Sequence, residues 1–136
     1  MKSVLLVGLG GFVGANLRVL VCDSAIKRWG DAFPLGTLLV NVFGSFLIGL
    51  LVMLLADRFA EDPELKKLII TGFLGAFTTF SSYMLEVVQL ITGQAHGQQG
   101  WLYLAVSIVL GLFAVLLGTY LGSQMSHSVT VHASAH

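Results

Sequence analysis

One stretch of the sequence, residues 71–83, carries groups that could bind an ion inside an otherwise apolar segment. It reads Thr-Gly-Phe-Leu-Gly-Ala-Phe-Thr-Thr-Phe-Ser-Ser-Tyr, where a membrane helix would ordinarily carry Leu, Ile and Val. In lipid, a backbone that leaves helical geometry must find new partners for its N–H and C=O groups. Such a break is tolerated where it lines a cavity, meets another protein surface or binds an ion. We therefore expect the function of the chain to reside here.

Polar side chains extend this pattern onto two helix faces. Thr37, Asn41 and Ser45 recur every four residues and therefore share one face. Beyond the break, a second face carries Thr79, Ser82, Glu86 and Gln89. Asn41 is open to two interpretations, a hydrogen bond between helices or a place in a polar pathway.

Two other features are equally open. Phe80 and Tyr83 lie three residues apart and neighbour each other on a helix. An aromatic pair at that spacing is more often packing than a site, although hydroxyl residues flank this one. Arg18, near the end of the first apolar segment, either extends to the membrane interface or lines an entry vestibule.

Together these residues predict a path for a small anion. The lining combines amide and hydroxyl donors with aromatic edges, which carry partial positive charge. Its members are Asn41, Thr79, Ser81, Ser82, Ser107, Phe80 and Tyr83. We expect no arginine or lysine at that depth, which suits an ion that sheds water without being trapped by an opposite charge. Glu86 is expected to form hydrogen bonds or an oligomer contact near the end of the stripe.

The composition is that of an integral membrane protein. Of the 136 residues, 56% are hydrophobic and 10% charged, against about 25% charged in a soluble domain. The formal net charge is zero, with no basic excess to indicate nucleic acid. The single cysteine, Cys22, excludes an internal disulfide. No combination of nucleophile, base and metal ligands predicts an enzyme.

The apolar segments predict one all-α domain, residues 1–125, with four membrane helices near 3–22, 35–56, 68–91 and 101–122. The third helix is expected to be broken, residues 23–34 and 57–67 to be connections, and residues 126–136 to form a flexible tail. Lys2, Arg58, Lys66 and Lys67 share one side of the membrane, and Arg18, Lys27 and Arg28 the other. This small Lys/Arg asymmetry predicts insertion in both orientations and hence an antiparallel homodimer.

The break at residues 75–78 also predicts a bound cation. A helix interrupted there frees carbonyl oxygens, which are hard ligands suited to an alkali cation. One chain supplies too few of them, whereas two chains related by a two-fold axis supply twice as many. The cation is expected where the third helices of two chains cross, and it is not itself transported.

Residues 36–41 (Gly-Thr-Leu-Leu-Val-Asn) and 72–81 (Gly-Phe-Leu-Gly-Ala-Phe-Thr-Thr-Phe-Ser), with Glu86 beyond, resemble the Fluc (CrcB) family of fluoride channels. The run from Gly11 through Gly14 and Ala15 to Arg18 is similar to that family as well. The resemblance covers essentially the whole four-helix region. It implies an antiparallel, dual-topology homodimer in the bacterial inner membrane, which exports fluoride passively through two pores.

The resemblance also implies roles for single residues. Backbone carbonyls of Gly75 and Thr78 would hold a structural sodium ion at the dimer centre, and Asn41 would be the pore asparagine. Phe80 and Tyr83 would face fluoride. The polar track would comprise Thr79, Ser81 and Ser82, with Tyr103 and Ser107 facing it from the fourth helix. The chain departs from the family pattern at Tyr83, where phenylalanine is usual, and at Ala76, where glycine often follows Gly75.

Two alternatives belong to other classes. One is a small proton-coupled multidrug exporter, which also has four helices and dual topology but needs a membrane-embedded carboxylate, usually in its first helix. Within residues 3–22 the sequence has Arg18 and no Asp or Glu. The other is an assembly subunit without transport activity.

Overall fold

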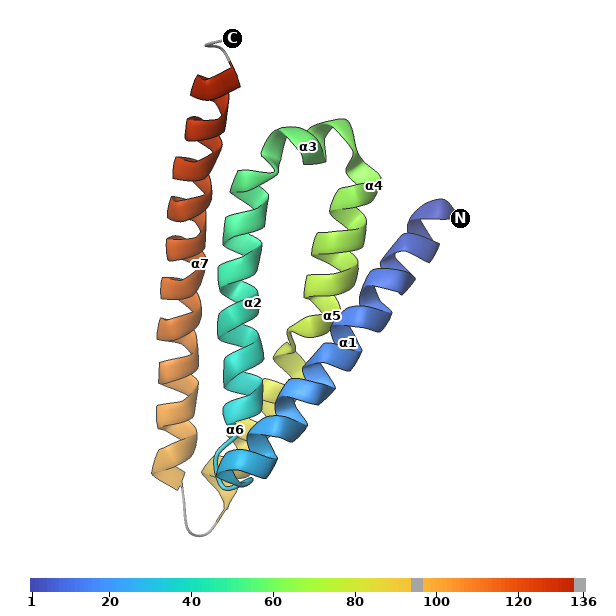
Figure 1. Cartoon of the computed structure of the whole chain (residues 1–136). Helices are drawn as coiled ribbons and strands as arrows, with labels where there is room; N and C mark the ends of the chain where they lie inside the picture. Colours follow the sequence, from blue (N-terminus) through green and yellow to red (C-terminus); the bar gives the residue numbers. More distant parts are fainter. Residues whose placement is uncertain (94–96, 134–136) are drawn as a thin grey trace.

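The computed structural model describes residues 1–93 and 97–133, with side chains as far as residue 126. Four helical segments are long and apolar enough to cross a membrane: Lys2–Trp29, Leu35–Leu54, Pro63–Thr92 and Gly97–Ser126. The second and fourth segments run side by side, the first lies obliquely against the third, and the third is interrupted (Figure 1). Most large apolar side chains on their outer surfaces are exposed, as lipid-facing positions require. The predicted all-α fold with four membrane helices is confirmed.

The first helix is longer than the sequence indicated. Helix α1 spans Lys2–Trp29, so the expected connection 23–34 is reduced to residues 30–34. Residues 23–29 contain neither Gly nor Pro, and Lys27 and Arg28 in the last turn complement the negative end of the helix dipole. Gly30 then ends the helix with a φ of 82°, a conformation that glycine adopts at little cost.

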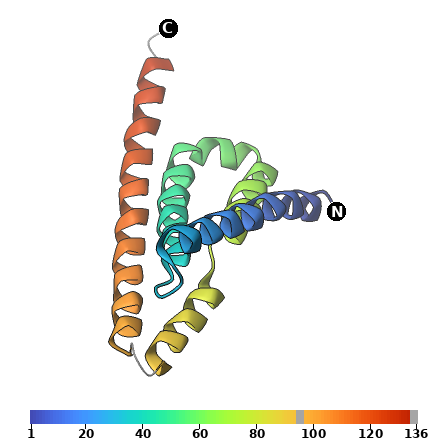
Figure 2. The same cartoon turned by 60° about the horizontal axis from the view of Figure 1, so that its bottom comes forward.

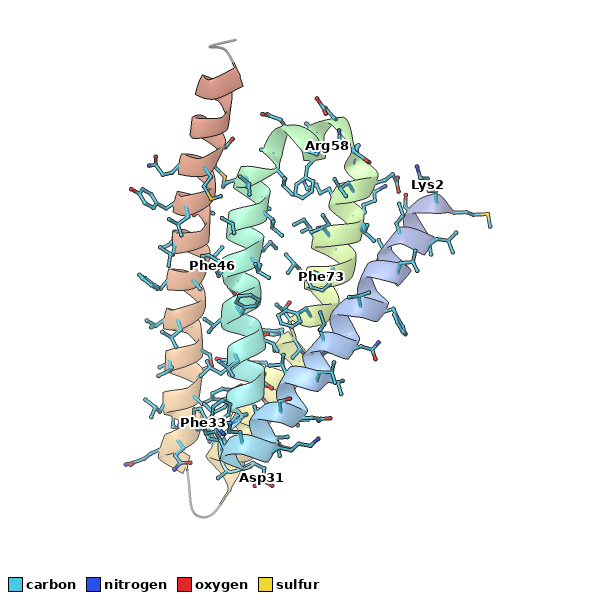
Figure 3. All side chains as sticks on the ribbon, in the orientation of Figure 1. Lys2, Asp31, Phe33, Phe46, Arg58 and Phe73 are labelled. Atoms are coloured by element: carbon cyan, nitrogen blue, oxygen red, sulfur yellow. The ribbon has the colours of Figure 1, made fainter. Side chains whose placement is uncertain are left out.

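The connection expected at residues 57–67 is also mostly helical. Helix α2, Leu35–Leu54, is followed by two short helices, α3, Ala56–Glu61, and α4, Pro63–Lys66. Asp62 caps α4, because its side chain accepts hydrogen bonds from the N–H groups of Glu64 and Leu65, each at 3.1 Å. Lys2 and Arg58 lie at this end of the bundle and Asp31 at the other (Figure 3).

The third membrane segment is broken as predicted. It begins with η1, a π-helix over Lys67–Leu74, and continues as α5, Gly75–Phe77. Thr78, with ψ 160°, and Thr79, with φ −150°, are extended, and α6, Phe80–Thr92, then leaves in a different direction (Figure 2). The unwound residues are therefore Thr78 and Thr79, whereas Gly75 keeps helical dihedral angles.

The last helix, α7, spans Gly97–Ala133 and continues beyond the expected end at residue 122. Residues 134–136 and the side chains of 127–133 lie outside the described residues, so the flexibility of the tail stays a prediction. Gly118 and Gly122 pack directly on the α2 backbone at Phe46 and Leu50. Gly10 and Gly14 likewise bring α1 onto the backbone at Phe73. These small residues let helices approach closely where lipid provides no hydrophobic incentive to associate.

Candidate functional site

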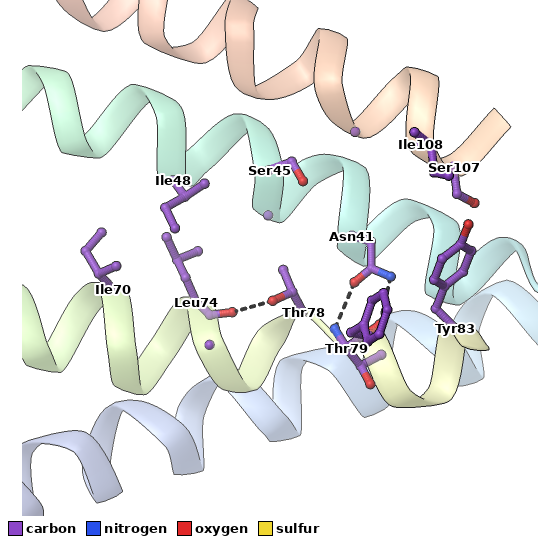
Figure 4. Close-up of a pocket in the computed structure, with 14 residues that line it drawn as sticks. Asn41, Ser45, Ile48, Ile70, Leu74, Thr78, Thr79, Tyr83, Ser107 and Ile108 are labelled. Carbon is purple, nitrogen blue, oxygen red and sulfur yellow. Dashed lines mark hydrogen bonds between the residues drawn. The ribbon is translucent and has the colours of Figure 1, made fainter. Parts of the chain in front are cut away.

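The break in the third segment is held by Asn41 of α2. The Asn41 side chain accepts a hydrogen bond from the Thr79 N–H at 2.8 Å and donates one to the Thr79 carbonyl at 2.9 Å (Figure 4). Both bonds replace partners that the Thr79 backbone would have found in a continuous helix. Of the two interpretations of Asn41, the structure supports a hydrogen bond between helices, and the same side chain lines a cavity.

Thr78 is held from three directions. Its Oγ1 donates to the Leu74 carbonyl at 3.0 Å, and its methyl group packs so closely on Gly44 that no Cβ fits there. Arg18 Nη1 donates to the Thr78 carbonyl at 3.3 Å. The expectation that no arginine or lysine lies at the depth of the path is therefore wrong. The long, flexible side chain of a residue nearer the helix end reaches inward to a carbonyl that lost its helical partner.

A first cavity, of about 430 Å³, lies beside the break, between α2, the third segment and α7. Its polar lining comes from Asn41, Ser45, Thr78, Thr79, Tyr83 and Ser107 (Figure 4). Apolar residues of the same wall include Ile48, Ile70, Leu74, Phe80 and Ile108. The cavity therefore offers neutral hydrogen-bonding groups in an apolar surround.

A second cavity, of about 380 Å³, lies on the other side of Thr79, which lines both. Its polar and charged lining comes from Arg18, Cys22, Asp23, Asp31, Thr37, Thr79, Ser82 and Glu86. This cavity includes the residue 30–34 turn, which lies at the Asp31 end of the bundle (Figure 3). Arg18 lines this cavity, and its role in an entry vestibule stays a prediction.

The two aromatic residues after the break differ in surroundings. Tyr83 is 6% exposed, donates its hydroxyl to the Leu104 carbonyl at 2.9 Å and packs edge-on against Tyr103 with ring centroids 5.2 Å apart. Phe80 is 74% exposed, although it contributes to the wall of the first cavity. Within one chain, Tyr83 is therefore part of the core and Phe80 projects from it.

Glu86 joins three helices. Its Oε1 accepts a hydrogen bond from Thr37 at 2.6 Å and its Oε2 accepts one from Tyr103 at 2.8 Å. Tyr103 is fully buried and Thr37 is 5% exposed. The prediction that Glu86 forms hydrogen bonds is confirmed. Tyr103 reaches Glu86 and the ring of Tyr83, and it lines neither cavity.

The three serines of the predicted track are dispersed. Ser82 lines the second cavity, and its hydroxyl accepts a bond from Thr79 Oγ1 at 3.0 Å. Ser107 lines the first cavity, and its Oγ is buried without a hydrogen-bond partner among the described residues. Ser81 is exposed and lines neither cavity. The structure thus brings Asn41, Thr79, Tyr83 and Ser107 together and leaves Ser81 outside.

Comparison with known proteins identifies the family. Residues 5–119 match the family model described as CrcB-like protein, Camphor Resistance (CrcB). The chain belongs to this family. Three relatives, each named "Fluoride-specific ion channel FluC", come from Hydrogenovibrio crunogenus, Rhizobium etli (strain CIAT 652) and Shewanella sp. (strain ANA-3). They are 43%, 45% and 45% identical to this chain over 90%, 87% and 94% of its length, and over 92%, 94% and 98% of their own. As a CrcB-like protein with four candidate membrane spans, the chain is a multi-pass membrane protein.

Sequence reasoning missed two contributors to the site of this CrcB-like chain. Gly44 was not singled out, although it lies between Asn41 and Ser45 of the polar stripe and its missing Cβ makes room for Thr78. The second is the backbone carbonyl of Leu104, which accepts a hydrogen bond from the Tyr83 hydroxyl. A pattern of side chains gives no information about such a backbone acceptor.

Proposed function

We propose that this chain is a fluoride-selective channel through which fluoride leaves the cytoplasm passively. The observation that carries the proposal is the meeting of two cavities at Thr79 within the membrane segments. Neutral donors line the first cavity, which suits a small anion that exchanges water for hydrogen bonds. Arg18 lines the second cavity together with Asp23, Asp31 and Glu86. The names of the relatives support fluoride as that anion. A channel of this kind is not an enzyme.

The test is fluoride efflux from liposomes that hold the purified protein. Fluoride should leave when a potassium ionophore clamps the voltage, with no imposed proton or sodium gradient, and chloride should be retained. Glu86 is a carboxylate at membrane depth, so a coupled exporter is the competing outcome. Asp23, which the longer α1 now includes, lines the second cavity beside the residue 30–34 turn. Flux that requires a proton gradient would assign the chain to the coupled class.

We further propose that the functional unit is an antiparallel homodimer with two pores. Gly75, Phe80 and Ser81 are all exposed in the single chain at or next to the break. A hydroxyl and a helix interruption facing lipid would be costly, and a second copy would cover them. Because the break lies near the middle of its segment, an in-plane two-fold axis would bring two breaks together.

Sodium at the centre of this dimer also remains a proposal. The donor set fits an alkali cation, since Thr78 is extended and its carbonyl therefore points away from the α5 ladder. Arg18 uses one lone pair of that carbonyl and leaves the second free. If sodium bound there, the carbonyls of Gly75 and Thr78 from two chains would hold it. Its positive charge would offset the repulsion between these carbonyl oxygens and so join the two protomers.

Gly75→Val tests the assembly. A Cβ at Gly75 meets its nearest atom, the Ile70 carbonyl oxygen, at 3.7 Å, so the chain itself accommodates a side chain. Gly75→Val should therefore fold but dimerise poorly, and replacing sodium with a large organic cation should weaken the wild-type dimer. Gly8→Val is the matched control, since nothing lies within 4 Å of its Cβ. Unchanged dimerisation of Gly75→Val in sedimentation experiments would contradict the proposed crossing.

A further inference from the structure

A polar network joins the start of α1 to the start of the third segment. The Ser3 hydroxyl donates a hydrogen bond to Glu64 Oε1 at 2.8 Å. Lys67 Nζ donates to Ser3 Oγ at 2.9 Å and to Glu64 Oε1 at 3.1 Å. The bonds of Ser3 join residues 61 and 64 positions apart, at the end of the bundle where the N-terminus lies (Figure 1). We call Ser3, Glu64 and Lys67 the N-terminal network.

The N-terminal network differs from an exposed ion pair. The side chain of Glu64 is 27% exposed, against 70% for Glu61 in the Arg58–Glu61 pair of α3. Glu64 Oε2 is buried without a hydrogen-bond partner among the described residues, so the carboxylate is held through Oε1. Loss of a donor would leave this partly buried charge with fewer partners, which costs more than loss of an exposed pair.

The network includes the first residue of an unusual helix. Lys67 begins η1, the π-helix that ends at Leu74, close to the break. A π-helix pairs residues five apart instead of four, and such stretches are rare and usually a single turn long. Because this pairing is rare, we expect η1 to depend on contacts with its neighbours. If η1 returned to α-helical pairing, the residues after it would rotate and shift, including Thr78 at the break.

Helix α1 contacts the third segment along this whole stretch. Gly10 and Gly14 pack on the η1 backbone, with no room for a Cβ at either position. Further along α1, Arg18 donates to the Thr78 carbonyl at 3.3 Å. The distance along the helix from Ser3 to Arg18 is about 22 Å, at 1.5 Å per residue. Within the described residues, side chains of α1 thus hydrogen-bond to the third segment on both sides of the glycine contact.

We propose that Ser3, Glu64 and Lys67 are positioning residues, which hold η1 in register with α1 and so set where the break presents the Thr78 carbonyl. The three residues line neither cavity described above, and they act on the break through the contact between η1 and α1. This inference rests on the proposed function for its flux measurement alone. The conformation of η1 can be measured in a protein that does not conduct.

The experiment follows hydrogen exchange of the backbone amides of residues 67–77 in the purified full-length protein in detergent micelles. Ser3→Ala should raise their exchange rate about tenfold, because a hydrogen bond to a charged group no longer opposes the opening of η1. Exchange in α7, which lies across α2 from α1 (Figure 1), should not change. Fluoride flux should decrease in the same variant. Ser3→Thr keeps the hydroxyl and should restore both values.

Lys67→Met removes two bonds of the same network, so its effect on η1 should be at least as large. The double variant with Ser3→Ala should exceed it little, since both changes act on one network. Ser24→Ala and Glu61→Gln are matched controls. Ser24 donates to the Leu20 carbonyl of its own helix at 2.6 Å, and Glu61 belongs to the exposed pair of α3. Both controls should keep the wild-type exchange of η1.

A localised rise of exchange in η1 supports the positioning role even if the wild-type protein does not conduct, and absence of wild-type flux would then overturn the channel proposal alone. Equal exchange of residues 67–77 in wild type and Ser3→Ala would overturn the inference. An equal rise in η1 and α7 would also overturn it, because the network would then contribute only to overall stability. In a conducting protein, raised exchange of η1 with unchanged flux would show that the register of η1 does not affect the break.

Discussion

Asn41→Ala removes both side-chain bonds that hold the Thr79 backbone at the break. Thr79 is 9% exposed, so its N–H and carbonyl would lose these partners in a largely buried position. Each buried polar group left unsatisfied costs about 1–3 kcal/mol, so two such groups lower the free energy of unfolding by about 2–6 kcal/mol. The loss of stability should be localised at the break in the third segment, and we expect fluoride flux to decrease as well.

Asn16→Ala is the matched control. Asn16 is exposed, and its amide donates at 2.6 Å to the Phe12 carbonyl of the same helix. Its loss leaves no buried group unsatisfied and should change the free energy of unfolding by no more than about 0.5 kcal/mol. The assay is unfolding of the purified protein in mixed micelles by increasing detergent, with fluoride efflux from liposomes measured in parallel.

Asn41→Asp distinguishes two roles of Asn41: holding the Thr79 backbone by two hydrogen bonds, and donating a hydrogen bond to an ion in the path. The carboxylate still accepts from the Thr79 N–H, but its other oxygen faces the Thr79 carbonyl where an N–H is needed. We therefore expect lower stability as well as abolished flux, because the charge also repels an anion in a poorly screened path. If Asn41→Ala had the same free energy of unfolding as Asn16→Ala and the same fluoride flux as the wild type, the reasoning would be refuted. Asn41 would then neither hold the Thr79 backbone nor line the path.

Two further substitutions test the surroundings of the break. Gly44→Ala places a methyl group against the Thr78 side chain and should reduce fluoride flux sharply. Gly8→Ala, which has open space around its Cβ, should leave the flux unchanged. Equal flux in the two variants would mean that Thr78 shifts freely. Glu86→Gln puts an amide N–H group against a hydroxyl donor, Thr37 or Tyr103, and should lower the free energy of unfolding by about 1–3 kcal/mol. Glu61→Gln, which removes an exposed ion pair, should change unfolding in the same micelle assay very little, and an equal effect of both would refute the inter-helix role of Glu86.

Local patterns in the sequence determined the membrane class, the four helices and the interruption of the third. Apolar runs of sufficient length can be satisfied in lipid only as helices. Glycine pairs such as Gly10 and Gly14, or Gly118 and Gly122, then let these helices pack backbone to backbone, because small residues permit close approach. The end of the first helix was predicted wrongly, because the charges of residues 23–29 suggested a loop. No residue there stops a helix before Gly30.

Only the tertiary structure decided which polar groups meet. Periodicity places Thr37 and Asn41 on one face, but it cannot show that one reaches Glu86 and the other the Thr79 backbone, because those contacts join residues 49 and 38 positions apart. The same limit applies to Arg18, whose side chain crosses 60 positions of sequence to the Thr78 carbonyl. Hydrogen bonds of this kind depend on how the helices cross and on backbone atoms that the break sets free, and neither is encoded in the type or spacing of a single residue.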